Sequence, residues 1–285
     1  MPQCDHVAET EPAVTGAPDA AARAEMRAKR VEDALAVGLS HTVSLTLGYE
    51  GSGFAGYARQ AETHIKTVQG ELESVLSMLY KRDVPIVCAG RTDAGVHALG
   101  QCAHFDYPGS IPPEKLPFVF NSMLPRDIRV IHAEQAEDAF HARYDAKGKR
   151  YIYTIYNSPH SSALLYNRTM HVPQPLDIES MRAAAQHIIG THDFKAFCAS
   201  GSYVKSTVRT VNRLDIVPEG PLIRIIIEGN GFLYNMVRII AGTLIRTGLS
   251  KLKPEEVEQI ILSRSRAAAG FTAQPQGLML DEVFY

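Results

Sequence analysis

The strongest candidate for a catalytic residue in this chain is an aspartate in a glycine-flanked loop. Asp93 lies in the run Gly90-Arg91-Thr92-Asp93-Ala94-Gly95, two residues after Arg91. A carboxylate held beside a guanidinium stays ionised at neutral pH, and an ionised carboxylate can act as a nucleophile. The same run is also ordinary turn chemistry, in which the aspartate side chain accepts hydrogen bonds from nearby backbone amides. On spacing alone the structural turn is the commoner use of such a run, so both interpretations stay open.

Two β-like segments flank this loop and must position it. Residues 84–89 are mostly apolar and β-branched, residues 101–106 follow the loop, and glycines at 90, 95 and 100 mark the turns. A strand-loop-strand frame of this kind would hold Asp93 at the rim of a sheet.

The elements around that frame predict an α+β unit. Residues 42–47 alternate polar and apolar as in a half-buried strand, and a helix with one apolar face follows Thr67, its expected N-cap. A helix over 114–123 and a strand over 128–133 complete the order β-α-β-β-α-β, which is the ferredoxin-like pattern.

The second half of the chain has the same character. We expect strands over 149–156, 204–217, 222–228 and 278–284, and helices over 177–189, 233–247 and 254–262. Periodicity alone predicts an α+β sandwich. Residues 1–40 are rich in Ala, Glu, Pro and Gly, which predicts a flexible N-terminal extension with a short helix over 20–37.

Composition limits the class of protein. The chain has 285 residues, of which 45% are hydrophobic and 21% charged, which suits a soluble globular protein. Its apolar runs fall short of the ~18 residues that cross a bilayer. The first residues lack a basic region followed by an apolar core, so we expect no secretory signal. The four cysteines are scattered and form no Cys-x-x-Cys pair, which favours a reducing cytoplasm over a disulfide framework. The histidines lack metal-ligand spacing, so we expect no metal site.

The charge balance allows nucleic-acid binding only through a local patch. The formal net charge is −2, but the acidic tail accounts for it and the remainder is close to neutral. One candidate patch combines basic and aromatic residues: Arg143, Lys147, Lys149 and Arg150 with tyrosines 144, 151 and 153. A second comprises Lys205, Arg209 and Arg213. Such runs are also common on solvated faces, although interleaved tyrosines favour base stacking.

The octapeptide Gly90-Arg91-Thr92-Asp93-Ala94-Gly95-Val96-His97 resembles the signature loop of the TruA family of tRNA pseudouridine synthases. Further segments match in the family's order: 49–60, 67–73, 121–128, 140–144, 149–153, 236–242 and 276–280. The resemblance covers residues 42–284. This chain departs from the family at Glu50, where an aspartate is usual, and at Tyr57-Ala58, where the family has Trp-Gln. Both departures lie outside the expected catalytic set.

The resemblance implies an architecture and an assembly. Residues 41–146 and 147–285 would form two ferredoxin-like (RRM-like) halves, the first of which carries the Asp93 loop. The halves would share a central, mostly antiparallel sheet with helices on one side and an RNA-binding cleft on the other. The family also implies a homodimer.

The resemblance further implies a reaction and its residues. Family members convert uridine to pseudouridine at tRNA positions 38, 39 and 40, in the anticodon stem-loop, without a cofactor. Asp93 matches the nucleophile, and Arg238 matches the arginine that pairs with it. Tyr151 matches the tyrosine that stacks on the target base, and Arg91 an arginine that helps to open the RNA stem or contacts the flipped nucleotide.

Each of these residues also has an ordinary structural interpretation. Tyr151 fits a half-buried strand aromatic, Arg238 an exposed helix residue, and Arg91 a phosphate contact or plain ion pair. The main alternative function is therefore a non-catalytic tRNA-binding or tRNA-folding protein on the same scaffold. A nucleoside hydrolase is weaker, because a glycosidase uses two carboxylates and only one stands out here.

Overall fold

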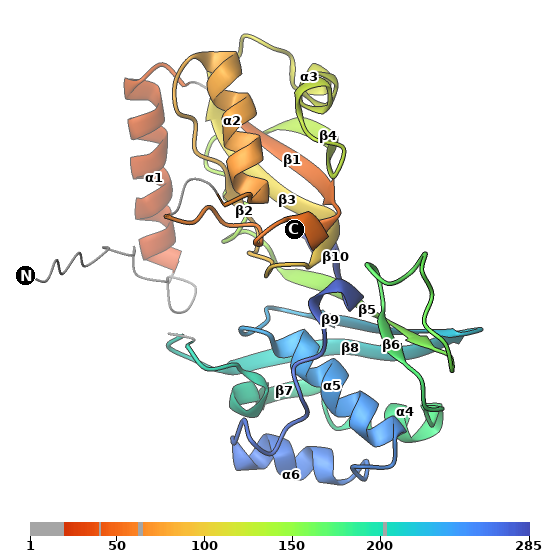
Figure 1. The fold of residues 1–285 in the computed structure, drawn as a ribbon. Coiled ribbons are helices and arrows are strands. Elements are labelled where there is room, and N and C mark those ends of the chain that lie inside the picture. The colour runs from red at the N-terminus through yellow and green to blue at the C-terminus, as the bar shows by residue number, and fades with distance from the viewer. Residues whose placement is uncertain (1–19, 40, 62–64, 202–203) are drawn as a thin grey trace, which may run out of the picture.

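One ten-stranded sheet runs through the whole molecule in the computed structural model, which describes residues 20–39, 41–61, 65–201 and 204–285 (Figure 1). The strands are β1 (His41–Tyr49), β2 (Val87–Cys88), β3 (His97–Tyr107), β4 (Ile128–Ala136), β5 (Gly148–Asn157), β6 (Met170–Val172), β7 (Gly190–Asp193), β8 (Val208–Glu219), β9 (Leu222–Gly229) and β10 (Leu278–Phe284). The helices are α1 (Ala20–Ala36), α2 (Val68–Tyr80), α3 (Leu116–Met123), α4 (Ile178–Gln186), α5 (Met236–Gly248) and α6 (Glu256–Ser263).

The last strand of the chain joins the two halves. The strand order is β4-β1-β3-β10-β5-β9-β8-β7, with β2 paired to β3 and β6 to β5. Strand β10 runs parallel to β3 and antiparallel to β5, and most other pairs are antiparallel. The joint is close, because a Cβ on Gly100 would lie 2.3 Å from the Asp281 carbonyl oxygen. The expected mixed fold with one shared, mostly antiparallel sheet is confirmed.

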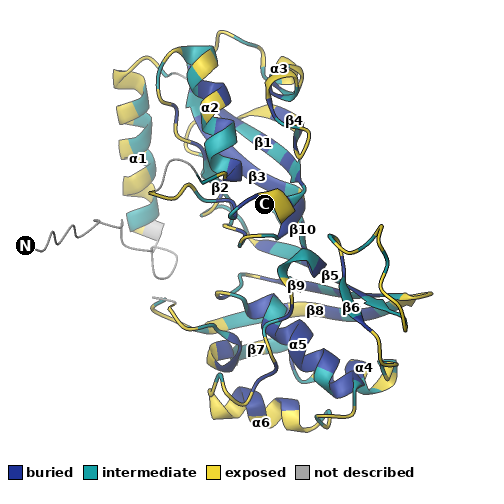
Figure 2. Ribbon diagram, viewed as in Figure 1, coloured by how far each residue is buried: buried dark blue, intermediate teal, exposed yellow. Residues whose placement is uncertain are grey.

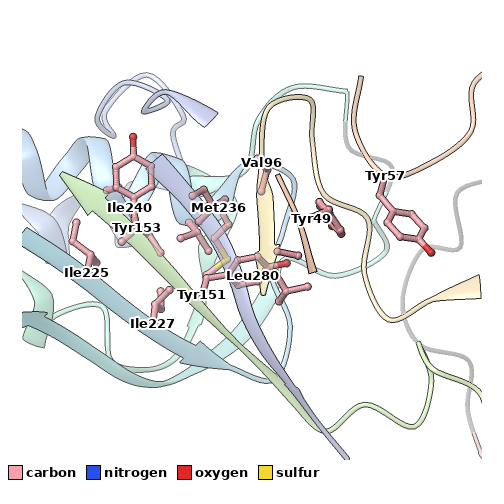
Figure 3. Packing of buried hydrophobic residues seen from close by; sticks show 14 of the residues in the cluster. Tyr49, Tyr57, Val96, Tyr151, Tyr153, Ile225, Ile227, Met236, Ile240 and Leu280 are labelled. Carbon is pink, nitrogen blue, oxygen red and sulfur yellow. The ribbon is translucent and has the colours of Figure 1, made fainter. Parts of the chain in front are cut away.

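One face of the sheet is continuously apolar across both halves. A single row of paired residues crosses six strands, and every member is buried: Tyr49, Ala98, Leu280, Tyr151, Ile227 and Leu214. Figure 2 shows buried residues along these strands, and Figure 3 shows Tyr151, Leu280 and Met236 gathered in the core. We call this side the helical face.

Helices from both halves cover the helical face. Phe120 of α3 packs on Phe105 of β3, with ring centroids 6.2 Å apart, and α5 buries its length in the same core. Local chemistry sets where these helices begin. The Thr67 side chain accepts a hydrogen bond from the Gly70 amide at the start of α2, as the sequence predicts, and Asp177 caps α4 in the same way.

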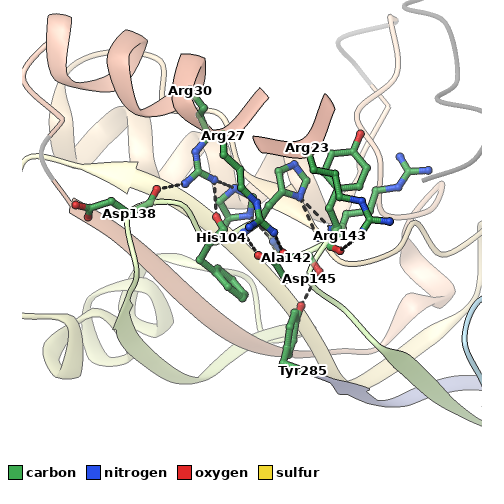
Figure 4. Close-up of polar contacts among 12 residues, drawn as sticks. Arg23, Arg27, Arg30, His104, Asp138, Ala142, Arg143, Asp145 and Tyr285 are labelled. Atoms are coloured by element: carbon green, nitrogen blue, oxygen red, sulfur yellow. Dashed lines mark hydrogen bonds and ion pairs between the residues drawn. The ribbon is translucent and has the colours of Figure 1, made fainter. Parts of the chain in front are cut away.

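Helix α1 lies against the opposite face of the sheet and departs from the expected one-sided arrangement. Thr42, whose side chain points away from the helical face, receives a hydrogen bond from Arg30. Arg30 also donates to the carbonyl oxygens of Phe140 (2.6 Å) and Asp138 (2.5 Å) (Figure 4). Arg27 pairs with Asp145 one helical turn earlier. A row of arginines therefore attaches α1 to the body.

The helix predicted over 20–37 is confirmed as α1, and the rest of the expected extension, residues 1–19, lies outside the described residues. The other predicted helices are confirmed with ends shifted by a few residues. Strand β2 has two residues where six were expected, and sequence reasoning missed β6 and β7. Among the described residues no helix is both long and apolar enough to cross a membrane.

Candidate active site

The loop that carries Asp93 is held by its backbone and by Thr92. The Tyr57 amide donates to the Thr92 carbonyl oxygen (3.0 Å), and the Val96 amide donates to the Asp93 carbonyl oxygen (3.1 Å). The Thr92 hydroxyl lies 2.7 Å from the buried Tyr49 hydroxyl. These bonds fix the turn without using the Asp93 side chain.

A polar platform supports the entrance of the same loop. The Lys149 ammonium donates to the Ala89 carbonyl oxygen (2.8 Å), and the Gln101 amide nitrogen donates to that of Gly90 (2.7 Å). Burial lowers the pKa of Lys149 to about 8. Gln101 is fully buried, so the peptides before Asp93 rest on groups that cannot move freely.

Two glycines let neighbouring backbone approach the loop. Gly51 lies against Val96, where an added Cβ would come within 2.0 Å of the Val96 carbonyl oxygen. Gly56 has a φ of +107°, and a Cβ there would lie 2.9 Å from the Thr92 carbonyl oxygen. A side chain at either position would displace the backbone that carries Asp93.

The Asp93 carboxylate has one charged neighbour within the described part of the chain. Its Oδ2 lies 3.7 Å from Nη1 of Arg238, and the side chain is 36% exposed. Among the described residues no backbone amide donates to this carboxylate, so the turn is not held by an aspartate cap. Partial burial raises the pKa of Asp93 above its ordinary value, and Arg238 opposes that rise.

Arg238 is oriented by groups other than Asp93. It lies in the first turn of α5, where Nε donates to the Ala273 carbonyl oxygen and Nη1 to Asn235 Oδ1, each at 2.7 Å. The side chain is only 15% exposed. The guanidinium thus faces Asp93 from a fixed position, in agreement with the pairing that the resemblance implied.

Arg91 does not lie beside the Asp93 carboxylate, as its position two residues earlier in the sequence suggested. It is exposed, and within the described parts of the chain it pairs with no acid. The guanidinium beside Asp93 therefore comes from Arg238, 145 residues later in the sequence. Burial raises the pKa of Asp93 by more than Arg238 lowers it.

Two hollows meet at Asp93. The larger, about 470 Å³, is lined by Ala58, Arg59, Tyr234 and Arg238 among others. The smaller, about 140 Å³, is lined by Tyr151 and by residues 232–237. Arg91, Thr92, Asp93 and Tyr234 line both.

Tyr151 lies in the smaller hollow together with Asp93. The residue is 8% exposed, and its ring meets the Phe232 ring edge to face, with centroids 5.1 Å apart. Among the described residues its hydroxyl has no hydrogen-bond partner. Burial raises the pKa of Tyr151, so the phenol stays protonated at neutral pH. The predicted aspartate, arginine and tyrosine are therefore brought together.

The hollows open on the helical face. Tyr151 belongs to the buried row of that face, and the first residues of α5 close the smaller hollow. The cleft was expected on the face of the sheet opposite the helices, whereas the hollows lie on the helical face. The site lies between the α2 half and the α5 half, where the two sets of helices separate.

Only part of the first predicted basic patch is available to a partner. Lys149 is bound beneath the Asp93 loop, and Arg150 pairs with Glu228, Asp281 and Glu282. Arg143 and Lys147 remain exposed. In the second patch Arg213 pairs with Asp215 and Glu228. Acids on other strands pair with Arg150, and Asp215 of the same strand pairs with Arg213, so both patches carry less free positive charge than their sequence runs suggest.

The departures at 50, 57 and 58 affect the rim of the site. The Glu50 side chain accepts hydrogen bonds from the amide and hydroxyl of Ser52. Glu50 thereby caps a short 3₁₀ turn over Gly51–Gly53. Tyr57 is buried against Tyr49, with ring centroids 6.3 Å apart. Ala58 lines the larger hollow.

The histidines near the loop have structural partners. The Gly51 amide donates to Nδ1 of His97 (2.9 Å), and Nε2 of that ring lies 3.1 Å from the Gln276 carbonyl oxygen. Within the described ranges no group of three or more His, Cys, Asp or Glu side chains is placed to hold a metal ion.

Comparison with known proteins decides the family. A family model described as tRNA pseudouridine synthase matches residues 47–145 and 184–285. This chain belongs to that family. Members of the family are isomerases that convert uridine to pseudouridine, so the chain is an enzyme of that class.

Named relatives in the family align over nearly their full lengths. A tRNA pseudouridine synthase A of Bacillus pumilus (strain SAFR-032) is 46% identical over 245 residues, which cover 85% of this chain and 98% of the relative. A tRNA pseudouridine synthase A of Thermoanaerobacter sp. (strain X514) is 48% identical over 243 residues, which cover 85% of this chain and 99% of the relative. The match to a solved Cbf5-Nop10-Gar1 complex covers 98% of this chain and 56% of the matched chain, at 13% identity. Its TM-score of 0.34 is too low to bear on the fold.

Sequence reasoning missed several residues of the site. Lys149 and Gln101 support the loop, Asn235 and Ala273 orient Arg238, and Tyr234 lines both hollows. Tyr234 could have been predicted from the sequence as a site residue, because it is a large aromatic just before a helix and outside that helix's apolar stripe. Ala273 could not, since only its backbone oxygen is used.

Proposed function

We propose that this protein isomerises uridine at positions 38, 39 and 40 of tRNA, with Asp93 as the nucleophile. The observation that supports this most is the Asp93 carboxylate, to which no described backbone amide donates. It lies 3.7 Å from a fixed guanidinium and lines a hollow that Tyr151 also lines. A structural aspartate would be bound to the backbone of its own turn. This one faces open space instead.

The reaction is a rearrangement and needs no external group. The N1–C1′ bond breaks, the base turns, and a C5–C1′ bond forms. The proton on C5 then leaves, and N1 gains a proton, so atoms and charge balance without a cofactor. Asp93 supports this either by attack at C1′ or C6 or by removal of the 2′ proton.

The neighbouring residues have distinct roles in this proposal. Arg238 keeps the carboxylate oriented and favours its charged form. Tyr151 stacks on the target base as a neutral phenol. Arg91, exposed beside both hollows, contacts the flipped nucleotide or its phosphate.

The site requires the target nucleotide to leave its stem. Turning out a base costs a few kcal/mol and is least costly near the end of a stem. Positions 38–40 lie at the base of the anticodon stem, which suits that cost. RNA would be recognised mainly by shape and backbone. We propose further that the enzyme acts in the cytoplasm as a homodimer.

Tritium release tests the proposal. tRNA carrying tritium at uridine C5 is incubated with the wild type and with Asp93→Asn, and released tritium is counted. Release by the wild type alone supports catalysis through Asp93. No release from either protein would favour the non-catalytic tRNA binder, and free uracil would identify a hydrolase.

A matched control keeps the result specific. Asp215 also pairs with an arginine, Arg213, and has similar exposure, but it lies on the opposite face of the sheet. Asp215→Asn should therefore release tritium at the wild-type rate.

A further inference from the structure

Tyr234 is a large aromatic side chain left exposed at the centre of the site. It is 47% exposed, whereas its neighbours Leu233 and Met236 are 5% and 1% exposed. It lines both hollows that meet at Asp93. The ring therefore stands on the wall between the place for the target base and the larger space beside it.

The backbone under this ring is fixed. The Tyr234 carbonyl oxygen accepts a hydrogen bond from the Ala199 amide (3.0 Å), and the Leu233 carbonyl oxygen accepts one from Met236 (3.0 Å). Asn235, next in the chain, has a φ of +57°, and its side-chain oxygen accepts a hydrogen bond from the Arg238 guanidinium. Tyr234 is thus tied to the arginine that faces Asp93.

The larger hollow has the chemistry of a nucleotide site. Tyr234 is the one aromatic residue among its described lining residues, which also include Arg91 and Arg59. The exposed Arg59 side chain pairs with Glu73 at 3.4 Å. An aromatic face binds any base by stacking, and guanidinium groups hold the phosphates on either side. The smaller hollow has its own rings, Tyr151 and Phe232, for the target base.

We propose that Tyr234 stacks on the nucleobase next to the target uridine and holds it in the larger hollow. This inference rests on the proposed function, because it assigns a second subsite to the same RNA. The phenol hydroxyl is not required, since stacking uses the ring. Among the described residues that hydroxyl has no hydrogen-bond partner, so its loss leaves nothing in the fold unsatisfied.

Kinetics on tRNA separate stacking from a structural role. Removing an aromatic base platform should raise KM by about 5- to 150-fold. We therefore expect Tyr234→Ala to raise KM in that range with kcat reduced less than threefold, and Tyr234→Phe to resemble the wild type. Phe118, 74% exposed on α3, provides the control, and Phe118→Ala should change neither constant.

A binding measurement gives a readout independent of turnover. Anticodon stem-loop RNAs with 2-aminopurine on either side of the target uridine are bound to Asp93→Asn, and fluorescence is followed. Stacking should quench at least one probe, and Tyr234→Ala added to this variant should abolish the quench.

The outcomes are distinct. An unchanged KM and quench in Tyr234→Ala would overturn the inference, as would a Tyr234→Phe variant as impaired as Tyr234→Ala. If the wild type releases no tritium, the proposed function fails, while the quench still reports whether Tyr234 contacts a base.

Discussion

Replacing Asp93 by asparagine should inactivate the enzyme without weakening its fold. The change keeps the shape of the side chain and removes its charge. Because burial raises the pKa of Asp93, the folded state favours the protonated form. That contribution to stability is fully present below the unfolded pKa, near 3.8, and is lost as the pH rises through the folded value. The asparagine variant does not undergo this loss.

The size of the effect follows from the exposure of the pair. Asp93 is 36% exposed and lies 3.7 Å from Arg238, so solvent screens their attraction to about 1 kcal/mol or less. Arg238 loses its acidic neighbour but retains its hydrogen bonds to Ala273 and Asn235. We expect the unfolding free energy at pH 8 to equal the wild-type value or exceed it by up to about 1 kcal/mol. This corresponds to a rise in Tm of about 0–4 °C.

Thermal unfolding followed by circular dichroism between pH 4 and pH 8 measures this difference, which should shrink toward pH 4. Tritium release on the same preparations should be absent. A loss of more than about 2 kcal/mol at pH 8 would refute the reasoning, because it would show that the carboxylate holds the loop. Asp215→Asn should change stability by no more than about 0.5 kcal/mol and retain activity.

Three other perturbations test the remaining parts of the site. Arg238→Met should reduce kcat/KM and move the acidic limb of its pH profile to higher pH, since Arg238 lowers the pKa of Asp93. Gly56→Ala should cost about 1–3 kcal/mol and most of the activity, because the φ of +107° is strained for alanine and the new Cβ would press on Thr92. Deletion of residues 1–38 should lower Tm through loss of the Arg30 hydrogen bonds, worth about 1.5–3 kcal/mol, and leave turnover largely intact because α1 lies on the face opposite Asp93.

Each of these has a matched comparison. Arg224→Met removes an exposed arginine that pairs with Glu219 and should leave the pH profile unchanged. Gly53 has open space around its Cβ position, so Gly53→Ala should be tolerated. Arg30→Ala in the full chain should reproduce part of the Tm loss. An unshifted acidic limb, equal activity of the two glycine variants, or a collapse in turnover after the deletion would contradict the respective expectation.

Local signals in the sequence were reliable where local bonds decide the structure. Thr67 caps α2 through its own side chain, and Gly95, with a φ of +78°, lies in the predicted turn after Asp93. Gly100 was also predicted to mark a turn and lies within β3 instead. The apolar stripe of α5 is buried as its period predicts. Strands β6 and β7 were missed because three or four residues carry no measurable period, and their hydrogen bonds come from β5 and β8.

By itself the sequence determined which side chain is the candidate nucleophile, the type of most elements and the order in which they follow. Only the tertiary structure decided that β10 joins the halves, that Ala273 and Asn235 orient Arg238, and that the hollows open on the helical face. It also decided that Arg150 is neutralised by three acids and that Tyr234 stands free between the hollows. These are contacts between residues far apart in the chain, set by strand pairing and packing, and no local period or propensity encodes them.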